Sequence, residues 1–445
     1  MKLRDIAIGA NASIYYRLNF KNIKGVYYPR TEQDVLTAIA HAQKNGFTIT
    51  PKGGGSGLSG ACTGGDDPRV MISTFQMKGI LSVSKAKGYI DVQPGVTPDK
   101  INEFLAPKGM RFFVAPSSRD VATVAGIIST DGGGNDTWIN GTMRDNTIRV
   151  KMVLYDGTTL VVDSKGVKSD DPELDEQLNR IGMTIHDVAN SHGTLGLITE
   201  MRLLIRPVVK EALMGGLAEF PECNSLGRAL HEMIRNKIRI NYGESIVEAH
   251  AEIREDLKPP LHIVEFPAEV ETEVKDIMDF RKLDSKELAR MKDIRVKLPK
   301  RTPKVGIQVA LFEDYGFYDK SLIKLQDNID AINALLIDHG MTPFAKYGHG
   351  PSKWYSGDNS ATYGLILHSR EIKPEGKAGQ EVFDAVLAIV QKCDELKVTP
   401  KPEHKWPYSD ETKKKRLEEV RAVIGRSFNP FLLSPECSDV LGSMV

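Results

Sequence analysis

Residues 51–60 combine five glycines and two serines in a spacing typical of nucleotide-binding turns. They read PKGGGSGLSG, and Gly55 to Gly60 follow the G-x-G-x-x-G pattern. A Rossmann turn with this pattern leads directly into a helix, and an acidic residue follows about 20 positions later to bind the ribose. The next residues, ACTGGDDPR, exclude a regular helix, and no Gly-Lys-Ser/Thr follows for a P-loop. Two interpretations remain: a mobile glycine turn, or a loop whose backbone N–H groups face an anion.

Two later stretches favour the second interpretation. Residues 115–136 read APSSRDVATVAGIISTDGGGND. Asp120 is a candidate N-cap for a helix over 121–129, which places Ser117, Ser118 and Thr123 near a helix start, and 132–134 form a second glycine loop. The third stretch, SHGTLGLITE at 191–200, leads into a strand over 201–205. Together the three stretches predict one large, elongated, polar ligand rather than three independent turns.

The elements that must position these loops follow from local patterns. Residues 25–28 and 47–50 read as strands. Between them, Thr31 to Asp34 resemble a capping box that opens a helix ending at Gly46. A further helix is predicted from Thr97-Pro98 to Leu105, with proline in its first position.

Composition limits the classes of partner. The chain has 445 residues, 41% hydrophobic and 27% charged, and is long enough for two or three domains. Lys plus Arg and Asp plus Glu both number 59, so no net field favours nucleic acid, and small molecules are the expected partners. The four cysteines form no C-x-x-C pair, and neither a signal-peptide h-region nor a long apolar run is seen, which predicts a reduced, cytoplasmic protein.

The order of the motifs resembles a known family. The stretches PKGGGSGLSG, VQPGVTPDKINEFLAPKGM, PSSRDVATVAGIISTDGGG, NGTMRDNTIRVKMVLYDGT and SHGTLGLITEMRLLIRP resemble the FAD-binding domain of the vanillyl-alcohol oxidase / PCMH flavoprotein superfamily, in its D-lactate dehydrogenase and glycolate oxidase branch. The resemblance is dense over 25–207. It implies an α+β fold in which two small α+β subdomains sandwich FAD. It also implies three parts: an FAD-binding domain (1–207), an α+β cap domain with an antiparallel sheet (208–400), and a C-terminal segment that returns to the FAD domain (401–445).

The same resemblance implies which residues contact FAD. The first loop would wrap the pyrophosphate, the second stretch would line the flavin and its phosphates, and the third would contact the adenine side or the ring. The first loop has no histidine, and its nearest thiol, Cys62, lies beyond Gly60, so we expect non-covalent FAD. The implied contacts are Pro51, Lys52, Gly53, Gly54, Gly55, Ser56, Gly57, Leu58, Ser59, Pro116, Ser117, Ser118, Asp120, Thr123, Gly126, Ser129, Thr130, Gly196 and Ile198.

The second half has fewer glycines and longer elements. Strands at 261–266 and 305–312 each precede a helical stretch, through about Phe280 and over 320–339, which indicates an antiparallel sheet backed by helices. Residues 281–304 carry ten basic and three acidic residues. They read either as a solvated helix and linker, or as a cationic surface that recruits anionic substrate or docks an acceptor or the inner face of a membrane.

Histidines in the second half match the family's catalytic pattern only in part. His349 in YGHG matches the first histidine of a paired motif, but the second has no equivalent. Further on, Glu403 and His404 match a Glu-His pair, although Lys405 replaces a glycine. His349, Glu403 and His404 could hold Zn²⁺ or Mn²⁺. The departures from the pattern make a bound metal less expected than its absence. His41, His231 and His339 are read as structural.

The implied chemistry is the oxidation of a small D-2-hydroxy acid such as lactate or glycolate. A hydride would move from Cα to flavin N5, while a base takes the hydroxyl proton. His404 is the candidate base. The substrate carboxylate needs a cation, and Arg144, Arg370 and Lys346 are the alternatives.

Other readings stay open at this point. A transferase resembling alkyl-glycerone-phosphate synthase uses the same fold with FAD, and a flavin-binding subunit could depend on a catalytic partner. The electron acceptor could be a quinone, a cytochrome, an electron-transfer flavoprotein or oxygen. A homodimer is also left open. NAD is not expected, since no nicotinamide-binding turn is present.

Overall fold

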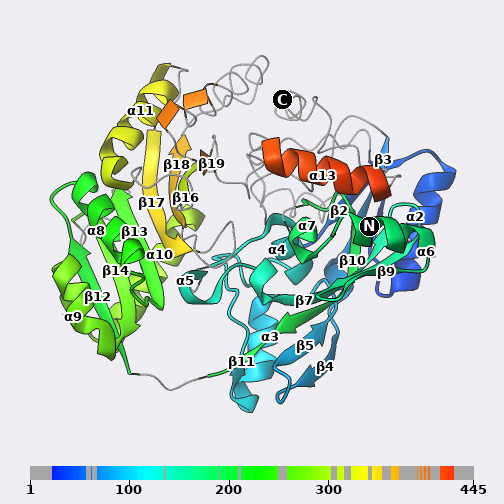
Figure 1. Cartoon of the computed structure of the whole chain (residues 1–445), viewed down its shortest axis with the longest axis horizontal. Coiled ribbons are helices and arrows are strands. Elements are labelled where there is room, and N and C mark those ends of the chain that lie inside the picture. The colour runs from blue at the N-terminus through cyan, green and yellow to red at the C-terminus, as the bar shows by residue number, and fades with distance from the viewer. Residues whose placement is uncertain are drawn as a thin grey trace. The chain divides into compact units, whose positions relative to one another are not determined.

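The computed structural model divides the chain into two compact units (Figure 1). The first unit holds 1–133, 143–208 and 402–445, and the second holds 134–142 and 209–401. The structure describes residues 23–56, 62, 68–134, 137–189, 191–208, 212–248, 258–301, 308–314, 322–338, 343–352, 362–369, 388, 391, 392, 395, 396, 399, 400 and 411–424.

A small parallel sheet begins the first unit. Its strand order is β1-β3-β2, and helix α2 connects β1 to β2. The predicted capping box is confirmed: the Thr31 side chain accepts from the Asp34 amide, and the Asp34 carboxylate accepts from the Thr31 amide. One face of α2 is buried with strand residues in a shared core. The bounds are β1 (Ile23–Tyr27), α2 (Glu32–Lys44), β2 (Thr48–Lys52) and β3 (Arg69–Ser73).

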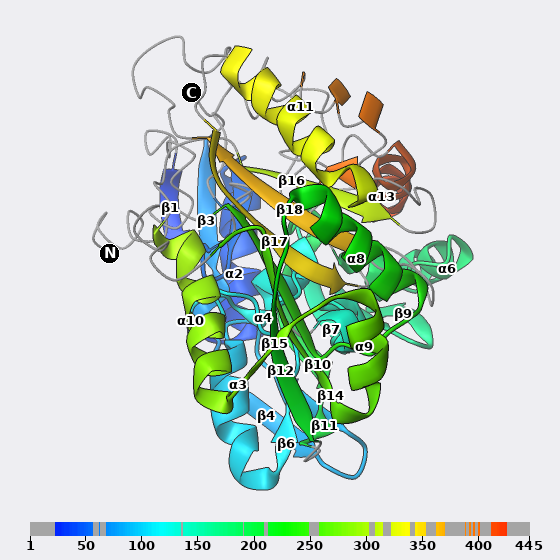
Figure 2. The same ribbon diagram turned by 90° about the vertical axis from the view of Figure 1, so that its left-hand side faces the viewer.

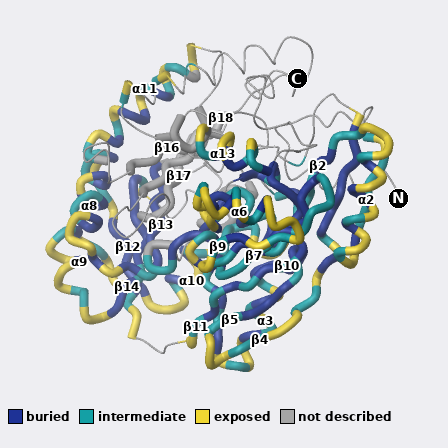
Figure 3. The backbone as a smooth tube through the Cα atoms, turned by 45° about the vertical axis from the view of Figure 1, so that its right-hand side comes forward, coloured by how far each residue is buried: buried dark blue, intermediate teal, exposed yellow. Residues whose placement is uncertain are grey.

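A six-stranded antiparallel sheet forms the rest of this unit, in the order β4-β5-β10-β7-β8-β9. One face of this sheet packs against helices of the same unit, and the buried residues between them form the larger core. Strands β5 and β10 are buried along most of their length (Figure 3). Strands β6 and β11 form a separate two-stranded antiparallel ribbon in the same unit. The bounds are β4 (Ile80–Ser84), β5 (Tyr89–Val92), α3 (Pro98–Leu105), β6 (Met110–Arg111), α4 (Val124–Thr130), β7 (Thr147–Leu154), β8 (Thr159–Asp163), β9 (Gly166–Ser169), α6 (Pro172–Arg180), α7 (Ile185–Val188), β10 (Gly196–Leu204) and β11 (Arg206–Pro207).

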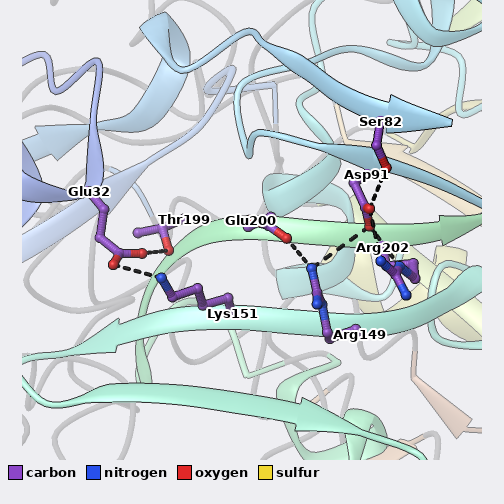
Figure 4. Close-up of polar contacts among 8 residues, drawn as sticks. All are labelled: Glu32, Ser82, Asp91, Arg149, Lys151, Thr199, Glu200 and Arg202. Carbon is purple, nitrogen blue, oxygen red and sulfur yellow. Dashed lines mark hydrogen bonds and ion pairs between the residues drawn. The ribbon is translucent and has the colours of Figure 1, made fainter. Parts of the chain in front are cut away.

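The other face of this sheet carries charged side chains that join strands to one another and to α2 (Figure 4). Glu32 on α2 accepts from Lys151 on β7 and from Thr199 on β10, both at 2.7 Å. The Glu32 carboxylate therefore fastens the small parallel sheet's helix to the larger sheet.

A second charged group lies farther along the same face. Arg202 on β10 makes a two-point contact with Asp91 on β5, at 2.7 and 2.9 Å, and Ser82 donates to Asp91 at 2.6 Å. Burial alone would raise the pKa of Asp91, but the hydrogen bonds from Arg202 and Ser82 outweigh it and lower that pKa. Arg149 on β7 pairs with Glu200 on β10. These contacts between β4, β5, β10 and β7 help to fix the register of the four strands.

Helix α13 (Glu411–Ile424) packs on the same unit although it is far along the chain. Its Val420 and Ile424 enter the larger core. Arg416 forms a two-point ion pair with Asp187, at 2.8 and 3.0 Å, and donates to the carbonyls of Ile181 and Gly182. A guanidinium with four such acceptors holds α13 against the turn between α6 and α7.

The second unit is built on an eight-stranded sheet in the order β15-β12-β14-β13-β17-β18-β16-β19. Every pairing in it is antiparallel, which confirms the antiparallel sheet predicted from the sequence. The bounds are α5 (Thr137–Asn140), β12 (Leu213–Glu219), α8 (Cys223–Arg235), β13 (Tyr242–Glu248), β14 (Leu261–Pro267), α9 (Glu271–Ile277), β15 (Arg281–Leu283), α10 (Ser285–Arg301), β16 (Gln308–Asp314), α11 (Leu325–Asp338), β17 (Pro343–Ser352), β18 (Thr362–Ser369) and β19 (Thr399–Pro400).

Helices cover both faces of one end of this sheet. Val264 and Phe266 of β14 pack with buried residues of α8 and α9 on one face. Helix α10 lies on the opposite face, where Lys292 pairs with Glu265 at 2.8 Å (Figure 2). Since Leu288 and Met291 of α10 are buried, the basic stretch 281–304 contains a strand and a partly buried helix rather than a fully solvated helix and linker.

No helix in the described part of the chain combines the length and the apolar character needed to cross a bilayer.

Ser245 and His262 form a buried polar pair between β13 and β14. They face each other in the strand register, and the Ser245 hydroxyl lies 2.8 Å from His262 Nδ1. Both residues are fully buried. Burial lowers the pKa of His262 from 6.5 to about 4, while Glu244 opposes the shift. The folded protein therefore keeps this histidine neutral.

This pair makes the stability of the second unit depend on pH. Between about 4 and 6.5 the unfolded chain binds a proton that folded His262 does not, so the free energy of unfolding falls as pH drops through this window. We expect His262→Gln to flatten that decrease, whatever its effect on stability at pH 7. Urea unfolding of both proteins at pH 5 and pH 7 measures it. His41→Gln, at an exposed site, serves as the control and keeps the decrease; an unchanged slope in His262→Gln would contradict the assignment.

Candidate functional site

The first glycine loop leaves β2 and presses its backbone against the segment before α4. A Cβ atom placed on Gly54 would lie 2.0 Å from the carbonyl oxygen of Val121, and one on Gly53 would lie 2.3 Å from Thr123 Oγ1. No real Cβ approaches other atoms so closely, so these two positions require glycine. The loop and the segment over 121–126 are therefore in close contact, Gly54 with the Val121 backbone and Gly53 with the Thr123 side chain.

The start of α4 differs from the sequence-based expectation. The helix begins at Val124, and its N-cap is Thr123, whose Oγ1 accepts from the Gly126 amide at 3.3 Å. Asp120 is not the cap. The Ser118 carbonyl already accepts from the amides of Val121 and Ala122, which holds the residues before Thr123 in a turn. Threonine then supplies the side-chain oxygen where the helix begins.

The third predicted stretch meets the other two. The His192 amide donates to the Ser129 carbonyl of α4 at 2.7 Å. Gly193 has a φ of +75°, and a Cβ there would lie 2.8 Å from Cγ of Pro51 at the end of β2. Tyr155 donates to the Gly193 carbonyl at 2.5 Å. Three segments separated by more than 60 residues in the chain thus come together in one place.

His192 lies at this junction and was missed from the sequence. Its side chain is buried, and its backbone has a left-handed φ of +53° that few non-glycine residues adopt. The signal available in the sequence was a histidine between Ser191 and Gly193 in a glycine-rich motif.

Arg144 anchors the second glycine loop. Asp131 ends α4 in a left-handed conformation, and its carboxylate accepts from the Arg144 amide at 3.1 Å and from Arg144 Nε at 2.6 Å. The Arg144 side chain is 9% exposed, and the Asp131 side chain is 6% exposed. The Met143 amide donates to the Gly132 carbonyl at 3.1 Å, which ties the loop's start to the same segment.

Lys52 provides a cation at the entrance to the first loop. It is the last residue of β2, and burial lowers its pKa, with Cys62 acting in the opposite direction. A partly desolvated ammonium group beside a glycine loop is suited to a phosphate.

Gly196 and Ile198 lie on β10. A Cβ on Gly196 would lie 2.7 Å from the Val153 carbonyl, and the Ile198 side chain is buried in the larger core. A ligand would therefore meet these positions through their backbone.

The predicted catalytic residues are placed only in part. His349 lies on β17, where its backbone pairs with Glu244 of β13 and Gly364 of β18. Lys346 lies on the same strand. Gly57, Leu58, Ser59, Arg370, Glu403 and His404 lie outside the described residues. Within the described ranges, no group of three or more His, Cys, Asp or Glu side chains is arranged to hold a metal ion.

Comparison with known proteins identifies the first unit's ligand. Residues 23–163 match a family model described as an FAD binding domain. This part of the chain is an FAD-binding domain. The resemblance read from the sequence motifs is thereby confirmed, and FAD is its cofactor.

Curated relatives match the chain over less than half of its length. A probable mitochondrial D-lactate dehydrogenase of Danio rerio is 30% identical over 202 residues, which are 45% of this chain and 38% of that protein. A D-2-hydroxyglutarate dehydrogenase of Escherichia coli (strain K12) is 30% identical over 169 residues, 37% of this chain and 16% of that protein. The match thus spans less than two fifths of the length of either relative.

A solved structure shares the fold over most of the chain. An alkyldihydroxyacetonephosphate synthase superposes with a TM-score of 0.62 over 89% of this chain and 76% of that one, at 17% sequence identity. Identity this low supports a common α+β fold and carries nothing about the reaction.

The residues present fit an FAD diphosphate. At the junction of the three loops, Gly53, Gly54 and Gly193 leave no room for larger side chains, and Lys52 precedes the first of them. Backbone N–H groups in such a loop are the donors that a diphosphate needs, and large side chains there would block its approach.

Gly54→Ala tests this fit. Because the added methyl group would meet the Val121 carbonyl, the loop must shift, and we expect the dissociation constant for FAD to rise at least about tenfold, roughly 1.4 kcal/mol. Fluorescence quenching on titration with FAD measures it, with circular dichroism to check folding. Gly25→Ala is the control, since its added Cβ meets nothing closer than 3.8 Å. Equal affinity in Gly54→Ala and the unsubstituted protein would contradict the placement of FAD at this loop.

Proposed function

We propose that this protein is an FAD-dependent oxidoreductase that oxidises a small D-2-hydroxy acid. The observation that carries the proposal is the FAD-binding domain at 23–163 combined with relatives named for D-lactate and D-2-hydroxyglutarate dehydrogenation. When bound, FAD would accept a hydride from the substrate's Cα. The remaining tasks fall to the protein: it must hold the cofactor, orient the acid and accept the hydroxyl proton.

The cofactor would be held by the three loops. We assign the diphosphate to the backbone of residues 51–59, and the flavin side to the segment from Pro116 to Thr123 with Gly126, Ser129 and Thr130. The backbone of Gly196 and Ile198 would take the adenine side. The contacts of the first loop with Val121 and Thr123, of His192 with Ser129 and of Gly193 with Pro51 support a single continuous site. We propose that the attachment is non-covalent.

The proton and the carboxylate need separate groups. His404 is our candidate base, because a neutral imidazole can accept a proton near neutral pH. Arg144 would have to leave its buried pair with Asp131 to bind a substrate carboxylate, so we assign it the task of holding the second glycine loop. Arg370 and Lys346 stay as candidate cations from the second unit. A Zn²⁺ or Mn²⁺ ion on His349, Glu403 and His404 is not needed for this assignment.

The finer architecture is part of the proposal. We infer a PCMH-type domain of two α+β subdomains over 1–207, a cap domain over 208–400, and a closing segment over 401–445. The division of the chain into two units, with α13 packed in the first, supports these boundaries. We expect a cytoplasmic location and an acceptor that is a quinone, a cytochrome, an electron-transfer flavoprotein or oxygen. We leave a homodimer, and contact of 281–304 with a membrane, as further expectations.

A transferase is the second candidate. An alkyldihydroxyacetonephosphate synthase shares the fold over 89% of this chain, so the fold alone does not separate a transferase from a dehydrogenase. The third candidate is a flavin-binding subunit that depends on a separate catalytic partner.

Anaerobic mixing separates these candidates. We expect D-lactate or D-2-hydroxyglutarate to bleach the oxidised flavin band at about 450 nm, and the L-enantiomers to leave it unchanged. His404→Asn should keep the flavin spectrum and slow the reduction about 100-fold, with His231→Asn as the control. If no D-2-hydroxy acid bleaches the flavin, the proposed oxidation is wrong, and the transferase or the dependent subunit is favoured.

A further inference from the structure

A cavity of about 560 Å³ lies in the second unit, lined by residues of helices α8 and α9 and of the end of strand β12 (Figure 1). We call it the α8–α9 cavity. Sites for small molecules have volumes of roughly 300–1,000 Å³, so a ligand of that size fits here. All of its lining residues belong to the second unit, whereas the loops to which we assign FAD belong to the first. The cavity is therefore separate from the cofactor site.

The most buried lining residues of the cavity are apolar. Ala229 is 6% exposed and Met278 is 4% exposed, and both belong to the core that α8 and α9 share with β14. Phe220 and Ile277 also line the cavity and are half-buried against the same core. Because this core holds the four side chains in place, the cavity is built into the packing of the two helices. Its floor can bury the aliphatic part of a ligand.

The more exposed lining residues include four carboxylates, those of Glu219, Glu232, Asp276 and Asp279. Among the described residues, no ion pair or hydrogen bond takes up the side chains of Glu219, Asp276 and Asp279. Glu232 lies 3.6 Å from the exposed guanidinium of Arg235, a long contact for an ion pair. Carboxylates gathered around one cavity add their fields and raise the local concentration of cations.

The one cation among the lining residues is already paired. Arg228 donates to the Glu222 carboxylate at 3.1 Å and to the Ser225 hydroxyl at 2.9 Å, and Glu222 is not a lining residue. The four carboxylates outnumber this guanidinium, so the cavity carries a negative charge. It would repel a hydroxy acid or a phosphate. The ligand that suits it has the opposite charge to the proposed substrate.

The carboxylates surround the cavity without converging on one point. Within the described residues, no group of three or more His, Cys, Asp or Glu side chains is arranged to hold a metal ion. A divalent cation needs several oxygen ligands at about 2.0–2.6 Å, so one ion cannot serve carboxylates that are spread around a cavity. A ligand with several separated charges can. Ammonium groups joined by alkyl stems match both features, since the stems cover apolar surface while the charges reach the carboxylates.

We propose that the α8–α9 cavity binds a linear polyamine. Its ammonium groups pair with Glu219, Glu232, Asp276 and Asp279, and its alkyl stems lie on the apolar floor. A basic protein segment would supply the same charge, but a stable protein interface buries about 800 Å² on each partner, and this cavity has the volume of a small-molecule site. The inference goes beyond the proposed function, because it gives the second unit a ligand that is neither the cofactor nor the substrate.

Calorimetric titration of the FAD-loaded protein with spermidine, a linear triamine, tests the site at low ionic strength. We expect Asp276→Asn combined with Asp279→Asn to weaken spermidine binding at least about tenfold, because two charge-assisted contacts are lost. Both positions are exposed, and circular dichroism checks that the variant folds. Glu273→Gln is the matched control and should change binding less than about threefold, since Glu273 is an exposed carboxylate of α9 that does not line the cavity. No binding by the unsubstituted protein, or equal binding by the double variant, would overturn the proposal.

Other cations define the class of ligand. Butylamine, which has a single charge, should bind at least about tenfold more weakly than spermidine, and an equal concentration of Mg²⁺ should leave spermidine bound. Displacement by Mg²⁺ would reduce the site to general attraction of cations, and tighter binding of tetralysine than of spermidine would assign it to a protein segment. Either result overturns the polyamine site. None of these titrations needs turnover, so their outcome is independent of the proposed oxidation.

Discussion

The close approach of two backbone segments is the constraint on which the site depends. Gly53 and Gly54 lie so near the turn before α4 that no Cβ fits between them, and a Cβ on Gly193 would lie 2.8 Å from the Pro51 ring. Each contact excludes a larger side chain from the junction of the three loops, where we place the diphosphate. The cofactor's charge would therefore be met by main-chain amides and by Lys52, a partly buried cation.

Contacts elsewhere in the first unit hold these segments together. The first loop leaves the small parallel sheet, whereas α4 and the 191–196 loop belong with the larger antiparallel sheet. Glu32 joins the two sheets through Lys151 and Thr199, and Val153 and Leu197 of the larger sheet enter the core beneath α2. Arg144 then fixes the far end of α4 through Asp131. The loops meet because these contacts, made by other residues, hold the two sheets together.

Local features of the fold could be predicted from the sequence, and long-range ones could not. The capping box at Thr31 and the helix from Pro98 to Leu105 depend on neighbouring residues and were found correctly. The start of α4 was misplaced because Ser118, Asp120 and Thr123 all have side chains that can cap, and the turn at Ser118 decides among them. Within the site, the three loops were identified from their glycines. The partner of Arg144, the burial of His192 and the carboxylates around the α8–α9 cavity depend on residues brought together by folding, and no spacing in the sequence reveals them.

Flavin selectivity tests the central claim most directly. If main-chain amides at the junction of the three loops grip the diphosphate, the flavin-free protein should bind FAD at least about 100-fold more tightly than riboflavin, which has the same ring system and no phosphate, a difference of roughly 2.7 kcal/mol. Fluorescence titration of both ligands under the same conditions gives the ratio. Equal affinities for the two, or no binding of FAD, would contradict the account.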